Sequence, residues 1–123
     1  MTALIFLVGI LMGAFGGILM KLGASHMGHV EIHSFGQLIT FVLKLFMNPL
    51  SLAGISLYFF SAVTWAYLLT KLDISLVQPI LALTYVVTPI LAIVILDEKV
   101  SLMRWAGILI IIIGVFVVAR TAV

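Results

Sequence analysis

Cysteine is absent from this sequence of 123 residues, and charged residues make up only 8% of it. Without cysteine, a disulfide framework, a thiol nucleophile and a cysteine metal site are excluded. The charged residues are scattered at the ends of apolar segments, so no basic patch is available for nucleic acid. Paired cavity carboxylates, a nucleophile with its base and a phosphate-binding glycine loop are also missing, and we therefore expect no enzyme.

Apolar residues, by contrast, account for 65% of the chain, which leaves too little polar surface for a soluble protein of this size. A membrane-spanning helix needs about 20 apolar residues. The sequence predicts an all-α fold, a single integral membrane domain of four transmembrane helices covering residues 1–123. The expected spans are about 3–21, 50–70, 74–96 and 100–119. The first lacks the basic start of a cleaved signal peptide and is expected to remain as an anchor.

A fifth helix is predicted between the first two spans, over about residues 31–47. Its polar residues recur at helical spacing and its apolar residues fill the opposite side. The polar residues are His33, Gln37, Thr40 and Lys44. This pattern is typical of an amphipathic helix that lies in the membrane interface. Asn48-Pro49 is expected to end it and turn the chain into the bilayer.

The basic residues indicate an orientation in the bilayer. Four of them, Lys21, Lys44, Lys99 and Arg104, fall on the side opposite the chain termini, and two, Lys71 and Arg120, fall on the terminal side. Positive residues favour the cytoplasmic side, so both termini are expected outside, with a dual topology left open. We expect a multi-pass protein of the cell inner (cytoplasmic) membrane.

Glycines recur on two of the predicted spans. Gly9, Gly13 and Gly17 form one stripe, whose alternative interpretations are a face packed on another helix, a narrow wall beside a substrate path, or ordinary tolerated glycines. Gly107 and Gly114 repeat at two-turn spacing and are candidates to seat a partner subunit.

Two spans carry half-polar faces that we expect to line a shared cavity. The second span presents Gly54, Tyr58, Ser61 and Trp65, and the third presents Gln78, Ala82, Tyr85 and Pro89. Polar side chains inside a bilayer either bind a substrate or hydrogen-bond a neighbouring helix, and both readings stay open. Pro79 and Pro89 each leave a carbonyl without its helical donor, which predicts either a transport-related kink or a tolerated one.

Ionisable residues are missing from the middle of every predicted span, which argues against an intramembrane proton relay. His26, His29, His33 and Glu31 have ligand chemistry, but they lie in a short glycine-rich stretch and are better explained as interfacial polar residues. No metal or other cofactor is expected.

The order of several short motifs resembles the drug/metabolite transporter superfamily, in particular its four-helix, EamA-like half-transporters. The motifs are a glycine-rich first helix ending in Lys21, Asn48-Pro49 with Gly54, Trp65, Leu72-Asp73-Ile74-Ser75 before Pro79, Glu98, Trp105, and Gly107 to Gly114-Val115. The resemblance covers nearly the whole chain. It implies a membrane transporter that works as a homodimer or as a heterodimer with another four-helix subunit.

Two branches of that superfamily are candidates for this chain. Small multidrug resistance proteins carry an essential glutamate in the first helix, where this chain has Gly13, and aromatic residues in the third helix, near which it has Gln78 and Leu81. The chain is more similar to subunits proposed to flip lipid-linked aminoarabinose. That similarity implies a lipid-linked sugar or a similar amphipathic substrate, bound by Tyr58, Ser61, Trp65, Gln78 and Tyr85, with Lys21 meeting its phosphate. A small-metabolite or drug exporter and a non-transporting scaffold subunit are the alternatives.

Overall fold

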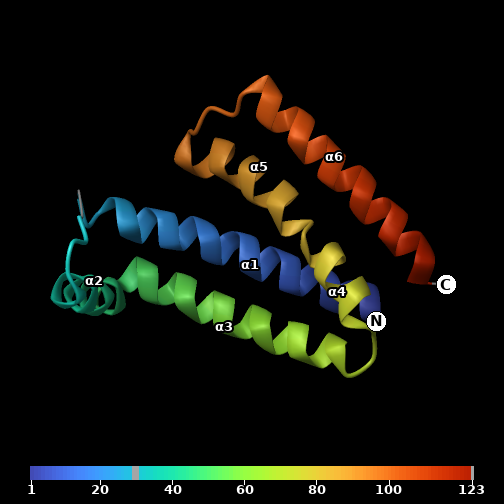
Figure 1. Ribbon diagram of the computed structural model, residues 1–123, viewed down its shortest axis with the longest axis horizontal. Coiled ribbons are helices and arrows are strands. Elements are labelled where there is room, and N and C mark those ends of the chain that lie inside the picture. The colour runs from blue at the N-terminus through green and yellow to red at the C-terminus, as the bar shows by residue number, and fades with distance from the viewer. Residues whose placement is uncertain (29–30, 123) are drawn as a thin grey trace.

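The computed structural model describes residues 1–28 and 31–122, and this part of the chain is helical with no strand. The helices are α1 (Thr2–Ser25), α2 (Phe35–Met47), α3 (Pro49–Leu69), α4 (Ile74–Leu81), α5 (Thr84–Leu96) and α6 (Leu102–Ala119), followed by the short 3₁₀ helix η1 (Arg120–Ala122). Both chain ends lie at the same end of the bundle as the α3–α4 connection, and α2 lies at the other end (Figure 1).

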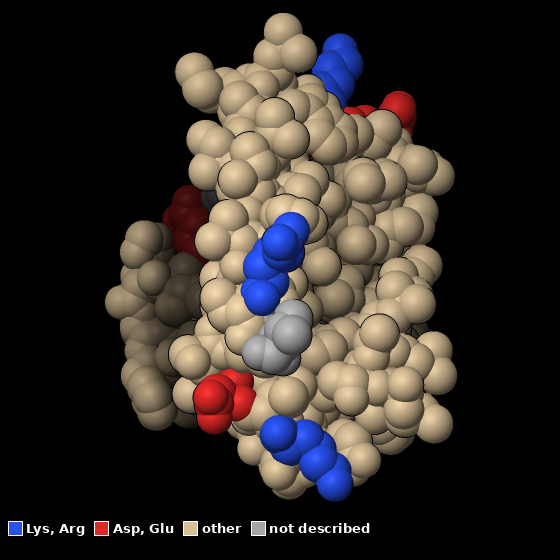
Figure 2. Space-filling model, turned by 90° about the vertical axis from the view of Figure 1, so that its right-hand side faces the viewer, with Lys and Arg blue, Asp and Glu red and all other residues tan. Residues whose placement is uncertain are grey.

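Four segments are long and apolar enough to cross a bilayer: Thr2–Ser25, Pro49–Leu69, Ile74–Leu96 and Leu102–Ala119. Many of their large apolar side chains are exposed, and Figure 2 shows only a few charged groups on a largely uncharged face. Such a surface requires lipid as its solvent. The structure thus confirms the predicted all-α membrane fold with four spans and a shorter apolar helix between the first two.

Helix α1 lies between α3 and α5 (Figure 1) and is the most buried of the spans. Its contact with α3 depends on small residues. A Cβ atom at Gly16 would lie 3.0 Å from the carbonyl oxygen of Gly54, and a Cβ at Gly23 would lie only 2.7 Å from the backbone nitrogen of Ser51. The two backbones can approach this closely only because these positions carry no side chain.

Asn48 fixes the point where the chain enters the second span. Its Oδ1 accepts hydrogen bonds from the backbone N–H groups of Leu50 and Ser51, which caps α3, and Pro49 occupies the first helical position. Its Nδ2 donates to the carbonyl of Gly23 at 3.1 Å. One side chain therefore joins the start of α3 to the last turn of α1.

Helix α2 begins at Phe35, four residues later than predicted. The Ser34 hydroxyl accepts the N–H of Gln37 at 3.3 Å, and this cap sets the start of the helix after residues 31–34. No residue of α2 is buried in the bundle. Its apolar side is therefore free to enter the membrane interface, as the amphipathic pattern predicts.

The third span, predicted over 74–96 with a kink from its prolines, is interrupted by a short turn. Helix α4 ends at Leu81 and α5 begins at Thr84, with Ala82 and Leu83 in a turn between them. Tight i to i−3 bonds replace the helical ones here, including Tyr85 N–H to the Ala82 carbonyl at 2.9 Å. The break falls between Pro79 and Pro89, each of which removes one helical donor and crowds the preceding turn.

Helix α6 lies outside α4 and α5 (Figure 1). Only Ile108 and Val115 are buried along it. Cβ atoms added at Gly107 and Gly114 would meet nothing within 4 Å. These two glycines therefore do not pack against another described part of the same chain.

Candidate functional site

A cavity of about 450 Å³ opens between α1, α3 and the broken third span. It is lined by Gly13, Tyr58, Ser61, Gln78, Leu81, Ala82, Thr84 and Tyr85. A second cavity of about 320 Å³ adjoins it, because the two share Tyr58, Ser61, Gln78 and Leu81, and adds Ala62 and Trp65. We call the two together the polar cavity.

Gly13 provides the α1 wall of the polar cavity. A Cβ atom there would lie 3.5 Å from the Ser61 hydroxyl oxygen and 3.7 Å from the Thr84 methyl group, which is ordinary contact. A larger side chain would have to extend into the space between α3 and α5. The absence of a side chain at this position helps to keep the cavity open.

The α3 wall is held against α1 by a hydrogen bond. Ser61 Oγ donates to the carbonyl of Gly9 at 3.0 Å, so this serine bonds across helices rather than to its own helix. Tyr58 lies one turn earlier, 46% exposed, and its hydroxyl would be 3.0 Å from a Cβ at Gly17. Gly9 and Gly17 thus lie where side chains of α3 approach α1 closely.

The broken third span supplies the opposite wall. No hydrogen bond to the side chain of Gln78 or Tyr85 is present within residues 1–28 and 31–122, and both side chains are exposed to the cavity or the lipid around it. Pro79 and Pro89 also deprive the carbonyls of Ser75 and Tyr85 of their usual helical donors. Side-chain polar groups without a partner at membrane depth are tolerated where they line such a cavity.

The lining is electrically neutral, since it contains no Asp, Glu, Lys, Arg or His. Trp65 adds an indole whose Nε1 is buried without a hydrogen-bond partner in the described part of the chain. The site can therefore hydrogen-bond a substrate through amide, hydroxyl and backbone groups, but it offers no charged partner.

The EamA-like transporter family matches residues 1–120. The chain belongs to this family. Neither comparison with curated proteins nor comparison with solved structures gives a match. Membership in the EamA-like family makes the chain a membrane transporter of the drug/metabolite superfamily, in agreement with the resemblance seen in its motifs and with its four apolar spans.

Most of the predicted substrate residues of this EamA-like chain come together. The structure places Tyr58, Ser61, Trp65, Gln78 and Tyr85 around the polar cavity. Lys21 is exposed near the C-terminal end of α1 and does not line it.

Thr84 is a cavity residue that the sequence analysis missed. It follows directly after the turn at 82–83 and lines the cavity beside Tyr85. The prolines Pro79 and Pro89 predict that the helix is disturbed, but they do not indicate that the turn falls at residues 82–83.

Within the histidine-rich stretch, the side chains of His33 and Glu31 make a hydrogen bond. His33 Nε2 lies 3.0 Å from Glu31 Oε2, and both side chains are exposed. No group of three metal-ligating residues occurs in residues 1–28 and 31–122. His29 lies outside the described residues.

Proposed function

We propose that this EamA-like chain is a transporter subunit that moves or flips a lipid-linked sugar or a similar amphipathic substrate through the polar cavity. The observation that carries the proposal is the neutral lining, in which Gln78 and Tyr85 have side chains without a hydrogen-bond partner in the described chain. Unpaired polar groups inside a membrane protein are costly, and they are usually retained for a ligand or a neighbouring helix.

A sugar head group suits this lining. Tyrosine combines an apolar ring with a polar tip, and the amide of glutamine both donates and accepts hydrogen bonds. These groups match a sugar ring, which has apolar faces and a rim of hydroxyls. Tyr58 and Tyr85 are 46% and 64% exposed, which supports a cavity that opens sideways to the bilayer. An amphipathic substrate would then keep its hydrocarbon chain in lipid while its head group crosses.

Lys21 is proposed to meet the phosphate of such a substrate at the membrane interface. It lies outside the cavity but near the end of the first span, and its side chain is exposed. A lysine at that depth extends its ammonium group to the head-group region. This arrangement follows the similarity to lipid-linked aminoarabinose flippase subunits.

Proton-driven drug export is the less favoured function. Gly13 stands where small multidrug resistance proteins carry their essential glutamate, and it lines the polar cavity without an ionisable group. A cavity without Asp, Glu, His, Lys or Arg lacks the group with which proton-coupled pumps usually exchange a proton for substrate. We therefore propose movement of the substrate down its gradient.

The functional unit is proposed to be a dimer in the cell inner membrane, with both termini outside. Gly107 and Gly114 lie on the largely exposed α6 and contact nothing within 4 Å, which leaves them available to a second four-helix subunit. Small residues of this kind permit close packing of helices in lipid. The partner is proposed to be another copy or a related chain.

Gln78→Ala and Lys21→Ala are each expected to reduce the flipping rate at least about tenfold, because a hydrogen bond to a charged or desolvated group is worth about 1.5–3 kcal/mol. The measurement is flipping of a lipid-linked sugar in vesicles reconstituted with equal amounts of folded protein. Lys71→Ala, which removes an exposed charge at the other end of the bundle, serves as the control and should retain activity. Wild-type rates in both Gln78→Ala and Lys21→Ala would refute this assignment of the site.

A further inference from the structure

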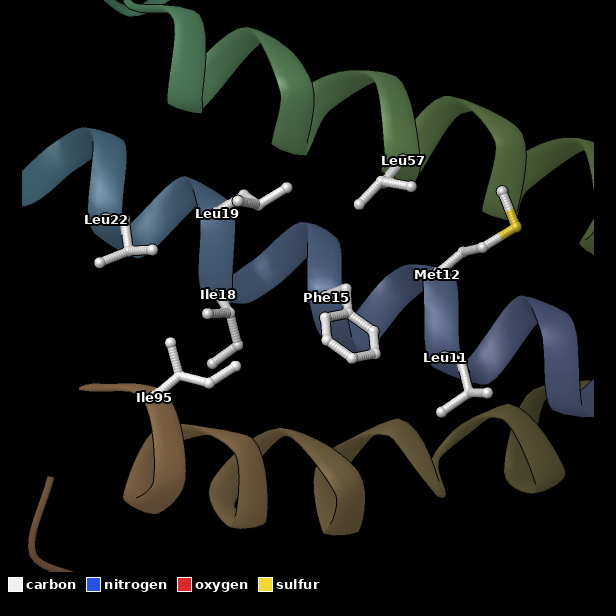
Figure 3. A pocket seen from close by; sticks show the side chains of 8 residues that line it. All are labelled: Leu11, Met12, Phe15, Ile18, Leu19, Leu22, Leu57 and Ile95. Carbon is white, nitrogen blue, oxygen red and sulfur yellow. The ribbon is translucent and has the colours of Figure 1, made fainter. Parts of the chain in front are cut away.

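A further cavity, separate from the polar cavity and lined only by apolar residues, runs along one side of α1. It has a volume of about 330 Å³ and no polar lining surface. Its walls are Leu11, Met12, Phe15, Ile18, Leu19 and Leu22 of α1, with Leu57 of α3 and Ile95 of α5 (Figure 3). We call it the α1 groove.

The α1 groove is separate from the polar cavity. Leu11, Phe15, Ile18 and Leu22 recur at intervals of three and four residues and share one side of the helix. Gly13, the α1 residue of the polar cavity, lies on a different side. The two cavities have no residue in common. A ligand of the groove is therefore distinct from the substrate proposed above, and this inference does not rest on that proposal.

The dimensions of the α1 groove indicate what fits into it. Its α1 wall spans Leu11 to Leu22, about 16 Å at 1.5 Å per residue, so its mean cross-section is about 20 Å². A helix with its side chains is about 10–12 Å across, and its section is at least about four times larger. A whole helix cannot enter the groove, whereas a single hydrocarbon chain can.

A polar group lies just beyond the end of the groove. His26 follows Leu22 by one helical turn, and its backbone remains in the right-handed helical region at the end of α1. The ring Nδ1 lies 2.6 Å from the Leu22 carbonyl oxygen, which can only accept, so Nδ1 donates this hydrogen bond. The ring is exposed, and its other nitrogen, Nε2, is available to a polar group in the head-group region.

We propose that the α1 groove binds a membrane phospholipid, with one acyl chain along Leu11 to Leu22 and the phosphate at His26. The apolar lining excludes any polar guest, and the groove lies at hydrocarbon depth in a span, where acyl chains surround the protein. The exposed polar ring of His26 lies one helical turn beyond Leu22, where the phospholipid head group would be placed. The bound lipid would fill space that the protein leaves empty between α1, α3 and α5.

The test is native mass spectrometry of the full chain, delipidated in detergent and titrated with a phosphatidylglycerol of defined chain length. Leu19→Trp and Leu11→Trp fill the groove at two positions, so each is expected to lose one bound phospholipid per chain. Leu109→Trp is the matched control, since Leu109 is 57% exposed on α6, away from the groove and on the side opposite Gly107 and Gly114, and it should retain the wild-type lipid count. Helicity by circular dichroism identifies folded samples.

Two results would overturn the proposal. One is an equal lipid count in the groove variants and the control. The other is a shift from dimer to monomer in Leu19→Trp with no lipid lost, which would identify the groove as a contact between chains. His26→Ala tests the phosphate contact. It is expected to weaken phosphatidylglycerol binding several-fold without affecting diacylglycerol, which lacks the phosphate, and equal binding of phosphatidylglycerol would disprove that contact.

Discussion

Gly13→Leu is expected to abolish transport while the protein remains folded. The added side chain extends from the α1 wall into the cavity of about 450 Å³, between Ser61 and Thr84. A substrate head group and a leucine side chain cannot occupy the same space. The measurement is the substrate flipping or uptake rate in reconstituted vesicles, with helicity and gel-filtration volume compared with those of the wild type.

Gly13→Ala is the matched control for this experiment. Its methyl group would make only ordinary contacts, 3.5 Å from Ser61 Oγ and 3.7 Å from Thr84 Cγ2. The alanine variant is therefore expected to transport at a rate within about threefold of that of the wild type, which corresponds to a change of less than 1 kcal/mol in free energy. Full activity of the leucine variant would mean that substrate does not pass Gly13.

Gly54→Ala is expected to destabilise the bundle by about 2–3 kcal/mol, at the upper end of the range for overpacked sites. Its Cβ would lie 2.7 Å from the Gly16 carbonyl oxygen and 2.9 Å from the Met20 backbone nitrogen. Both are backbone atoms of α1, so they cannot move aside as a side chain can. The helices must separate along their contact and lose packing there.

Gly114→Ala separates this effect from the general consequences of replacing a glycine. Nothing lies within 4 Å of a Cβ at Gly114, so the monomer should keep its stability within about 0.5 kcal/mol or gain slightly. Unfolding by denaturant in micelles, at a dilution where the chain is monomeric, compares the two variants. Equal stability of both variants would show that the α1–α3 contact does not depend on Gly54.

The positions of the spans could be predicted because they depend on hydrophobic length alone. Apolar runs bounded by Lys21, Asn48-Pro49, Asp73 and Arg120 leave little freedom for where a helix can leave the bilayer. The expected meeting of Tyr58 and Ser61 with Gln78 and Tyr85 also followed from one property, helical spacing on two neighbouring spans. Both inferences use local features of the sequence: the length of its apolar runs and the helical spacing of its polar residues.

The features that escaped prediction depend on three-dimensional detail. Two prolines, Pro79 and Pro89, weaken the third span at separate points, and their positions do not determine that the turn falls at 82–83. Thr84, which lines the cavity, follows directly after that turn. The α1 groove could not be predicted from the sequence, because apolar residues such as Leu11 and Leu22 are expected equally on a face that contacts lipid, a helix or an empty groove.

A capping residue explains the late start of α2. His33 fits the polar side of an amphipathic helix by spacing, but the hydroxyl of Ser34 caps the N–H of Gln37 and the helix begins after it. Serine is among the preferred N-cap residues, so this signal was available in the sequence. The amphipathic period alone overestimated the length of the helix.

The central claim is that the polar cavity of this EamA-like chain binds an amphipathic lipid-linked sugar. Its most direct test is a mass spectrum of the lipids that co-purify with the wild-type chain and with Gly13→Leu, extracted from native membrane in a mild detergent. We predict a sugar-bearing lipid phosphate with the wild type and its loss with Gly13→Leu, while phospholipid in the α1 groove is retained by both. Bulk phospholipid alone with the wild-type chain would contradict the claim.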